Sequence, residues 1–339
     1  MTPSPTLVDD FIAYFGKLCS YSVQRPAVKS GWGAQVSERG RCRKKVSSAD
    51  VIENSWMWVD SEAKVEEARE DLDSSSLISL DTEYDSMHYF REKLCLVQVR
   101  ASKRTYVFDP FNGIDLQFLR PYFADPRLLK VTHAGDNDIR ILKRDYGFEF
   151  RNIFDTHRAA HMLGSQYLAL SSIIEQYLGV EIEKTKKMQR SKWEARPLSE
   201  GQLRYAVQDT AYLADLYRHL NEKLSLKGMQ ERARKVFENV AAVSWREKTL
   251  DLLGHRRISG YASLTADSKG RLKKLYRWRF HKARQTNRAM FLILPDSALL
   301  SLSEGNWQSV EELRSAGILS EGKTDLYGSE LMKVLCGEC

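Results

Sequence analysis

Apolar and polar residues alternate between residues 56 and 225 in a pattern that predicts an α/β domain. The segments 78–85, 93–100 and 104–110 are short, apolar and rich in residues that favour strands. Because only short links separate them, we expect an antiparallel meander. Continuous apolar residues before position 81 also predict that the first of these strands is covered on both faces. Two further strands are predicted, at 56–59 and 128–132.

Helical spacing of apolar residues fills most of the remaining chain up to residue 225. We predict helices at 60–72, 136–146, 153–163, 170–180 and 198–224. Ser199, two residues after Pro197, is a suitable N-cap for the last and longest of them. Strands first and strand–helix alternation afterwards predict an α/β domain with a mixed sheet over residues 51–225.

The chain on either side of this domain has a different pattern. Residues 1–50 are poorly periodic and are interpreted as an N-terminal extension of uncertain order. From residue 226 onward the sequence offers no convincing strand, and repeated helical spacing predicts an all-helical second part. We divide it into a helical connector, 226–266, and a helical domain, 267–339.

Composition places the chain among globular proteins of the cytoplasm. The chain has 339 residues, enough for two domains, with 42% hydrophobic and 29% charged residues. No apolar stretch approaches the roughly 18 residues of a membrane span, and the N-terminus lacks the basic start of a secretory signal. Five scattered cysteines do not suggest disulfides, and Cys336 and Cys339 lack the two further ligands of a zinc site.

Positive charge is concentrated in the second part of the chain. Residues 223–288 contain 18 Lys and Arg against 5 Asp and Glu, whereas the whole chain has a net charge of only +7. The rest of the chain is therefore net negative. A solvated helical surface would also be basic, but so large a local excess favours binding of a nucleic acid.

Two acidic residues, Asp81 and Glu83, end the strand predicted at 78–85. Positions i and i+2 of a strand point to the same side, so both carboxylates face one spot. Two converging negative charges are costly unless a cation joins them, and carboxylate oxygens suit Mg²⁺ or Mn²⁺. Taken alone, the pair could equally be acidic turn residues.

Two more acidic positions follow along the chain. Asp136 and Asp138 begin a predicted helix, where an acidic residue can simply cap the helix. Tyr205 and Asp209 are four residues apart in the longest helix and therefore lie on one face of it. The alternative for this last pair is a core tyrosine beside a surface aspartate.

A strand Asp-x-Glu, a helix-start Asp and a helical Tyr-x3-Asp, in this order, resemble the DEDD superfamily of 3′-to-5′ exonucleases. The tyrosine indicates the Tyr subgroup, since Arg204 stands where the sister subgroup has its histidine. Five successive blocks narrow the resemblance to the ribonuclease D family: LISLDTEY, KLCLVQV, HAGDNDI, IFDTHRAA and ARPLSEGQLRYAVQD. The resemblance covers residues 56–225.

The resemblance implies an RNase H-like fold and two divalent ions, Mg²⁺ or Mn²⁺, in each active site. Carried over by position, the metal ligands are Asp81, Glu83, Asp138 and Asp209. Tyr205 then orients the attacking water, and hydrolysis releases 5′-mononucleotides from a 3′ end. Asp136 and Asp155 are expected to be helix caps instead.

Residues 267–339 resemble the HRDC module, which implies an auxiliary role in nucleic-acid binding or scaffolding. Residues of both parts are candidates for contact with substrate: His133, Gln98, Trp193, Lys273, Lys274, Arg277 and Arg284. A structural role is the alternative for His133, and simple anchoring of a loop is the alternative for Trp193. On the basic helix, core packing is preferred for Tyr276 and Trp278.

The segment 317–324 matches the P-loop string, but a P-loop must follow a buried strand. The residues before it are helical in pattern, so we expect no nucleotide-binding loop there.

These observations lead to the hypothesis of a metal-dependent 3′-to-5′ exoribonuclease. Its partner would be an RNA with a free 3′ end, with tRNA precursors implied by the family, and no membrane or obligatory protein partner is expected. Two alternatives stay open. One is the same chemistry on DNA, and the other is a non-catalytic RNA-binding or scaffolding protein.

Overall fold

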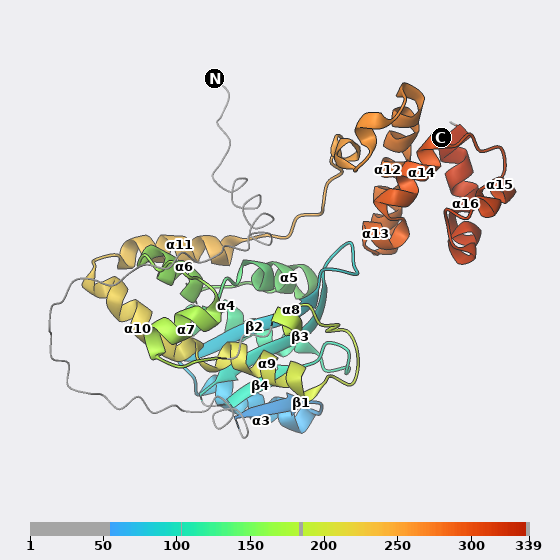
Figure 1. Cartoon of the computed structure of the whole chain (residues 1–339). Helices are drawn as coiled ribbons and strands as arrows, with labels where there is room; N and C mark the ends of the chain where they lie inside the picture. Colours follow the sequence, from blue (N-terminus) through green and yellow to red (C-terminus); the bar gives the residue numbers. More distant parts are fainter. Residues whose placement is uncertain (1–54, 103, 183–185, 337–339) are drawn as a thin grey trace. The chain divides into compact units, whose positions relative to one another are not determined.

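A computed structural model describes residues 55–102, 104–182 and 186–336 of the chain. The predicted extension at 1–50 and Cys339 lie outside these residues. A six-stranded sheet with the order β1-β4-β3-β2-β5-β6 forms the centre of the first part (Figure 1). Its strands are β1 (Trp56–Val59), β2 (Leu77–Asp85), β3 (Lys93–Ala101), β4 (Arg104–Phe108), β5 (Leu129–Thr132) and β6 (Ile153–Asp155).

The sheet is mixed, as the sequence predicts. Strands β2, β3 and β4 form the predicted antiparallel meander, whereas β1 pairs with β4, β5 with β2 and β6 with β5 in parallel. The central position of β2 explains its continuous apolar residues, since neighbouring strands and helices cover it on every side.

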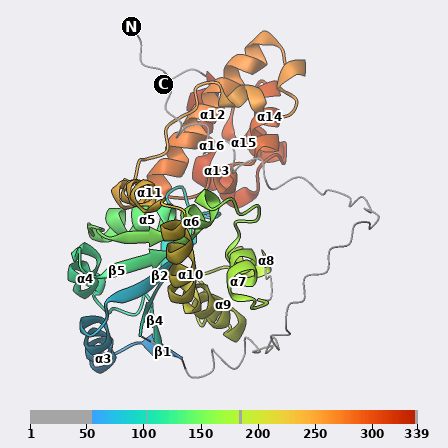
Figure 2. The same cartoon turned by 90° about the vertical axis from the view of Figure 1, so that its left-hand side faces the viewer.

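Helices cover both faces of the sheet (Figure 2). One face packs against α3 (Glu62–Asp73), α4 (Arg120–Ala124) and α5 (Asp136–Tyr146) in one apolar core. The other face packs against a second set of helices: α6 (Thr156–Met162), α7 (Leu170–Leu178), α9 (Glu200–Ala211) and α10 (Leu213–Leu226). The short helix α8 (Lys186–Gln189) precedes α9.

Alternation along β2 decides which side chains reach which face. Ile78 and Leu80 belong to the core beneath α3 and α5, whereas Leu77 packs with the α10 core. Successive strand residues point to opposite faces, so Asp81 and Glu83 point toward α9 and α10.

Three elements differ from the sequence-based expectation. Residues 153–155 form strand β6 and not the start of a helix, because three buried residues are too few to show a strand period. The helix predicted at 198–224 is interrupted at Tyr212, where α9 ends and α10 begins. Helix α11 (Gln230–Ala242), expected in the connector, packs Phe237 and Val240 into the cores of the first domain.

The second part of the chain is helical, as predicted. Between residues 251 and 336 the structure forms two short 3₁₀ turns and then helices around a separate apolar core. These helices are α12 (Ala266–Thr286), α13 (Met290–Ile293), α14 (Asp296–Glu304), α15 (Val310–Ser315) and α16 (Glu321–Cys336). Helix α15 lies directly before the P-loop string, so the strand that a P-loop needs is replaced by a helix. Among the described residues, no helix is long and apolar enough to cross a membrane.

Candidate active site

Strand β2 and helix α9 bring three of the predicted acidic residues together. One carboxylate oxygen each of Asp81, Glu83 and Asp209 lies within 4.8 Å of the other two. Helix α9 begins at a capping box, in which Ser199 accepts a bond from the Gln202 amide and the Gln202 side chain accepts one from the Ser199 amide. This confirms Ser199 as the predicted N-cap and fixes the start of the helix that carries Asp209.

Asp138 lies beside this group, on α5. Its side chain is buried and accepts a hydrogen bond from the hydroxyl of Thr82, the strand residue between the two acids. Thr82 points to the α5 side of the sheet, whereas its two neighbours point to the α9 side. The negative charge of Asp138 nevertheless raises the pKa of both Asp81 and Glu83, so all four acids share one electrostatic site.

The turn before α5 is held from two directions. A Cβ atom at Gly135 would lie 2.7 Å from the Thr132 hydroxyl oxygen, so only glycine fits there. The buried carboxylate of Asp155 accepts a bond from the Gly135 amide at 2.9 Å and also caps α6 through the Arg158 amide. The predicted cap role of Asp155 is therefore confirmed.

Asp136 does not cap α5, and that prediction is wrong. Gly135 is the N-cap residue, and Asp136 instead forms an ion pair with Arg158, whose Nη2 lies 3.0 Å from both carboxylate oxygens. Because this carboxylate already has a cation, it is not a candidate metal ligand.

Burial and mutual repulsion disfavour negative charge on the other four acids. Burial first, and then the neighbouring carboxylates, raise the pKa of Asp81 and Glu83 well above the usual range. Burial likewise raises the pKa of Asp138 to about 6 and that of Asp209 to about 7, partly offset by hydrogen bonds from Thr82 and Tyr205. Among the described residues, no Lys, Arg or His forms an ion pair with any of the four. Hard oxygen donors without a protein cation are the donor set that a divalent metal ion requires.

Tyr205 lies one helical turn before Asp209. Burial, followed by the charges of Asp209 and Glu83, raises the pKa of its hydroxyl far above the usual value. The phenol therefore stays protonated at neutral pH, and it can donate a hydrogen bond but cannot serve as a base.

Gln98 lies on β3 directly opposite Asp81, but it is fully buried. Neither polar atom of its side chain has a hydrogen-bond partner within the described parts of the chain. The structure therefore shows a buried Gln98 side chain with no exposed surface, and its contact with substrate stays a prediction.

His133 and Trp193 also have structural surroundings. His133 Nδ1 lies 2.9 Å from the Thr156 hydroxyl, and burial beside His157 lowers the pKa of the imidazole to about 3. The imidazole is therefore neutral and hydrogen-bonded, as in the structural alternative. Trp193 is only 1% exposed and packs 6.0 Å from the ring of Tyr205. So little exposed surface favours the alternative, in which the indole anchors its loop, and stacking of Trp193 on a base stays a prediction.

The cationic candidates on α12 fall into two groups. Lys273, Lys274 and Arg277 are exposed, and none of them makes an ion pair with a residue that the structure describes. Arg284 is also exposed, but its Nη2 lies 2.9 Å from the Glu247 carboxylate. Trp278 packs against Tyr327 and donates a hydrogen bond to Glu330, in agreement with the predicted core role.

Sequence reasoning missed Thr82 and the second function of Asp155. The strand alternation places Thr82 on the face opposite its acidic neighbours, and this signal could have identified it. The bond that the Gly135 amide donates to Asp155 has no local signal, because it joins residues that are 20 positions apart and meet only when β6 lies beside β5.

Comparison with known proteins gives the family. The model of the 3′-5′ exonuclease family matches residues 56–225, half of the chain, and the model of the HRDC domain matches residues 268–335. A protein named ribonuclease D from Sphingobium indicum is 30% identical over 266 residues, which cover 77% of this chain and 67% of that protein. An exosome complex component 10 homolog from Drosophila melanogaster is 29% identical over 274 residues, 79% of this chain.

Solved structures agree with this assignment. The crystal structure of Escherichia coli RNase D has a TM-score of 0.63 and 25% identity, covering 84% of this chain and 75% of that one. The catalytic core of RRP6 from Trypanosoma brucei has the same fold, with a TM-score of 0.74 at 21% identity over 83% of this chain and 79% of that one. Against the animal and plant relatives, the chain covers only 26% to 33% of their length. The family model therefore shows a 3′-5′ exonuclease, and the bacterial relative shows that the chain belongs to the ribonuclease D family, with an HRDC domain after its exonuclease domain.

Proposed function

We propose that the protein is a metal-dependent 3′-to-5′ exoribonuclease that removes nucleotides one at a time as 5′-monophosphates. The observation that carries the proposal is the meeting of Asp81, Glu83 and Asp209 within 4.8 Å of one another, with no ion pair to a Lys, Arg or His that the structure describes. Buried carboxylates in this arrangement are unfavourable in the protein alone and become favourable when divalent cations bind.

The four acids would hold two ions of Mg²⁺ or Mn²⁺. Asp81, Glu83 and Asp209 supply the ligand oxygens of the group, and Asp138 supplies the oxygen that Thr82 does not engage. When bound, such a pair of cations supplies Lewis acidity at the phosphodiester and makes hydroxide available near neutral pH.

Tyr205 would orient the attacking water. Its hydroxyl keeps its proton because burial and three nearby carboxylates raise its pKa. A fixed phenol one turn from Asp209 can hold a water molecule in line with the scissile bond, and the packing of its ring against Trp193 restricts its rotation.

The substrate we propose is a structured RNA with a free 3′ end, and tRNA precursors are the class that the family suggests. E. coli RNase D is described as an exoribonuclease involved in structured RNA processing. Several relatives are named as exosome complex components, whereas the sequence predicts no obligatory protein partner for this chain. The cytoplasmic location stays a prediction.

The test is degradation of a 5′-labelled single-stranded RNA by the full chain in Mg²⁺, in Mn²⁺ and in chelator. We expect a ladder that shortens from the 3′ end in both metals and intact RNA in chelator. A 3′-phosphorylated RNA of the same sequence is the matched control, because it should resist attack. An intact RNA in every lane would contradict the proposal and favour the non-catalytic alternative.

A DNA strand of identical sequence tests the second candidate, a 3′-to-5′ exodeoxyribonuclease. Discrimination between RNA and DNA depends on contacts to the 2′-hydroxyl. If the DNA strand is shortened faster than the RNA strand at equal concentration, the exodeoxyribonuclease replaces the exoribonuclease.

A further inference from the structure

A chain segment without helix or strand, residues 243–250, follows α11 and lies along α5 and the β2–β3 loop; we call it the strap. Its beginning is fixed by Lys143, whose Nζ donates to the carbonyl oxygens of Ala241 and Val243 at 2.5 and 2.9 Å. Further on, the guanidinium of Arg144 lies 5.6 Å from the ring of Trp245. Helix α5 therefore binds the strap through two consecutive cationic residues.

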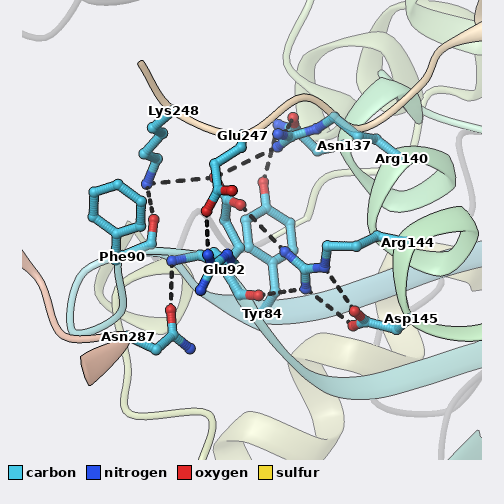
Figure 3. Close-up of polar contacts among 11 residues, drawn as sticks. Tyr84, Phe90, Glu92, Asn137, Arg140, Arg144, Asp145, Glu247, Lys248 and Asn287 are labelled. Carbon is cyan, nitrogen blue, oxygen red and sulfur yellow. Dashed lines mark hydrogen bonds and ion pairs between the residues drawn. The ribbon is translucent and has the colours of Figure 1, made fainter. Parts of the chain in front are cut away.

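Glu92, in the β2–β3 loop, is the centre of the polar contacts that fix the rest of the strap (Figure 3). Its carboxylate is only 11% exposed and lies 3.6 Å from Arg140, 3.6 Å from Arg144 and 3.8 Å from Lys248 of the strap. Lys248 also donates to the Phe90 carbonyl at 2.5 Å. One partly buried anion thus joins three cations from two separate parts of the chain, and without it their charges would repel one another.

The same contacts extend to the four acids Asp81, Glu83, Asp138 and Asp209, which we call the carboxylate cluster. Arg140 donates to Asn137 at 2.9 Å, and Asn137 donates to the hydroxyl of Tyr84 at 3.0 Å. Tyr84 follows Glu83 on β2, and Asn137 precedes Asp138 on α5. The hydrogen bond between them therefore joins the two elements that carry these acids, one residue away from each acid.

The β2–β3 loop and the strap also bind α12 of the HRDC domain. The Phe90 ring lies 5.2 Å from the ring of Phe280, edge to face, within the HRDC core. Asn287, which ends α12, accepts a bond from the Arg91 amide at 2.8 Å. From the strap, Glu247 forms ion pairs with Arg91 and with Arg284.

We propose that Glu92 is a positioning residue: by holding the strap on α5, it keeps β2 and α5 in the register that brings Asp138 to the other three acids. It follows that attachment of the strap and binding of divalent ions at the carboxylate cluster stabilise each other. The inference rests on the proposed metal site but not on RNA cleavage. Reciprocity is a thermodynamic requirement, because a contact that favours metal binding must itself be favoured by the metal.

The experiment is limited proteolysis of the full chain with chymotrypsin, following the bond after Trp245 by mass spectrometry in Mn²⁺ and in chelator. None of the variants substitutes Trp245, so the cleavage site is the same in all of them. We expect Mn²⁺ to slow this cleavage several-fold in the natural protein. In Glu92→Gln, cleavage should be about fivefold faster and indifferent to Mn²⁺, since proteolysis follows the population of the detached strap.

Calorimetric titration with Mn²⁺ supplies a readout that uses neither protease nor RNA. Glu92→Gln should bind Mn²⁺ more weakly, by at most the factor by which Mn²⁺ slows cleavage of the natural protein, since linkage sets this limit. Glu67→Gln is the matched control, because it removes another Glu–Arg pair, with Arg104, on the exposed surface of α3. It should change neither readout. Lys248→Gln, at an exposed position of the strap, should shift both readouts in the direction of Glu92→Gln and to a smaller extent.

Two results would overturn the inference: cleavage of Glu92→Gln at the rate of the natural protein, or equal protection of both proteins by Mn²⁺. Failure of the proposed function looks different. A protein that Mn²⁺ protects at the strap but that leaves RNA intact would contradict the nuclease and keep the positioning role. A protein that shortens RNA while Mn²⁺ leaves strap cleavage unchanged would contradict only the positioning role.

Discussion

Strand β2 carries Asp81 and Glu83 of the carboxylate cluster, and the loop that follows it carries Glu92, but among the described residues only Glu92 is paired with protein cations. At the carboxylate cluster, Asp81 and Glu83 face two further acids and no protein cation forms an ion pair with them in the described structure. At the strap, Glu92 faces three cations within 3.8 Å. The charges of the carboxylate cluster are therefore neutralised only when external cations bind, whereas the charge of Glu92 is neutralised by side chains of the protein.

This difference predicts opposite consequences for the same chemical change. Removal of one negative charge from the carboxylate cluster relieves repulsion, so it stabilises the metal-free fold while it destroys a metal ligand. Removal of the charge of Glu92 leaves three cations close together and destabilises the fold, by about 1 kcal/mol for partly exposed ion pairs. A site for function and a site for structure can thus be distinguished by the sign of a stability change.

The largest expected effect is that of Asp81→Asn. The amide keeps the shape of the side chain but cannot hold a divalent ion as a carboxylate does, so we expect RNA cleavage to fall by about 10³-fold or more. The melting temperature in chelator should rise at the same time, because one of the repelling charges is gone. Cleavage assays and calorimetry in chelator check the two parts. A fall in both the activity and the stability without metal would contradict this distinction, because Asp81 would then stabilise the fold as Glu92 does.

Tyr205→Phe should reduce kcat by about 10²-fold, because the attacking water loses the hydroxyl that orients it. The ring and its packing against Trp193 are kept, so the melting temperature and the affinity for Mn²⁺ should change little. Single-turnover cleavage with saturating metal measures the chemical step. Natural activity in this variant would contradict the assignment of Tyr205 to the attacking water.

The pH dependence of stability should follow the raised pKa values. Asp138 and Asp209 have folded-state pKa values of about 6 and about 7, above those of an unfolded aspartate near ~4. The folded protein therefore holds more protons, and this contribution to stability is fully present below pH ~4 and is lost as pH rises through 6 and 7. Melting curves in chelator should move to lower temperature over this range. The stabilisation by Mn²⁺ should grow over the same range, because metal binding displaces the protons. Curves in chelator that do not depend on pH would show that the acids are already neutralised.

Local chemistry made most of the exonuclease domain predictable from the sequence. Apolar alternation, the Ser199 capping box and the placement of Asp81 and Glu83 on one face of β2 depend on neighbouring residues, and the structure agrees with each. Burial was harder to predict. Nothing in the sequence around Trp193 or Gln98 indicates that α9 and the sheet enclose them completely.

Long-range pairing accounts for the remaining differences. Strand β6 is three residues long and exists because it pairs with β5, and α11 joins the exonuclease core because Phe237 and Val240 find partners there. Asp136 was expected to cap its helix because the sequence does not show that Arg158, 22 residues later, lies beside it. Glu92 gave no signal at all, since its three cations come from α5 and from the strap.

The smallest expected effect concerns RNA binding by the cations of α12, some of which have an ion-pair partner and some of which do not. Lys273 and Lys274 are exposed and have no acidic partner among residues 55–336 that the structure describes, whereas Arg284 is paired with Glu247. The double substitution Lys273→Gln and Lys274→Gln should weaken RNA binding a few-fold and reduce the salt dependence of binding by about two phosphate contacts.

Arg284→Gln is the matched control, because the charge of Arg284 is already neutralised by Glu247. It should leave the salt dependence of RNA binding unchanged and instead increase chymotrypsin cleavage after Trp245. RNA binding titrations at several salt concentrations separate the two effects. If Arg284→Gln lowers the salt dependence as much as the lysine substitutions do, Arg284 binds RNA in spite of its ion pair with Glu247. Ion pairing within the protein would then not predict which cations contact RNA.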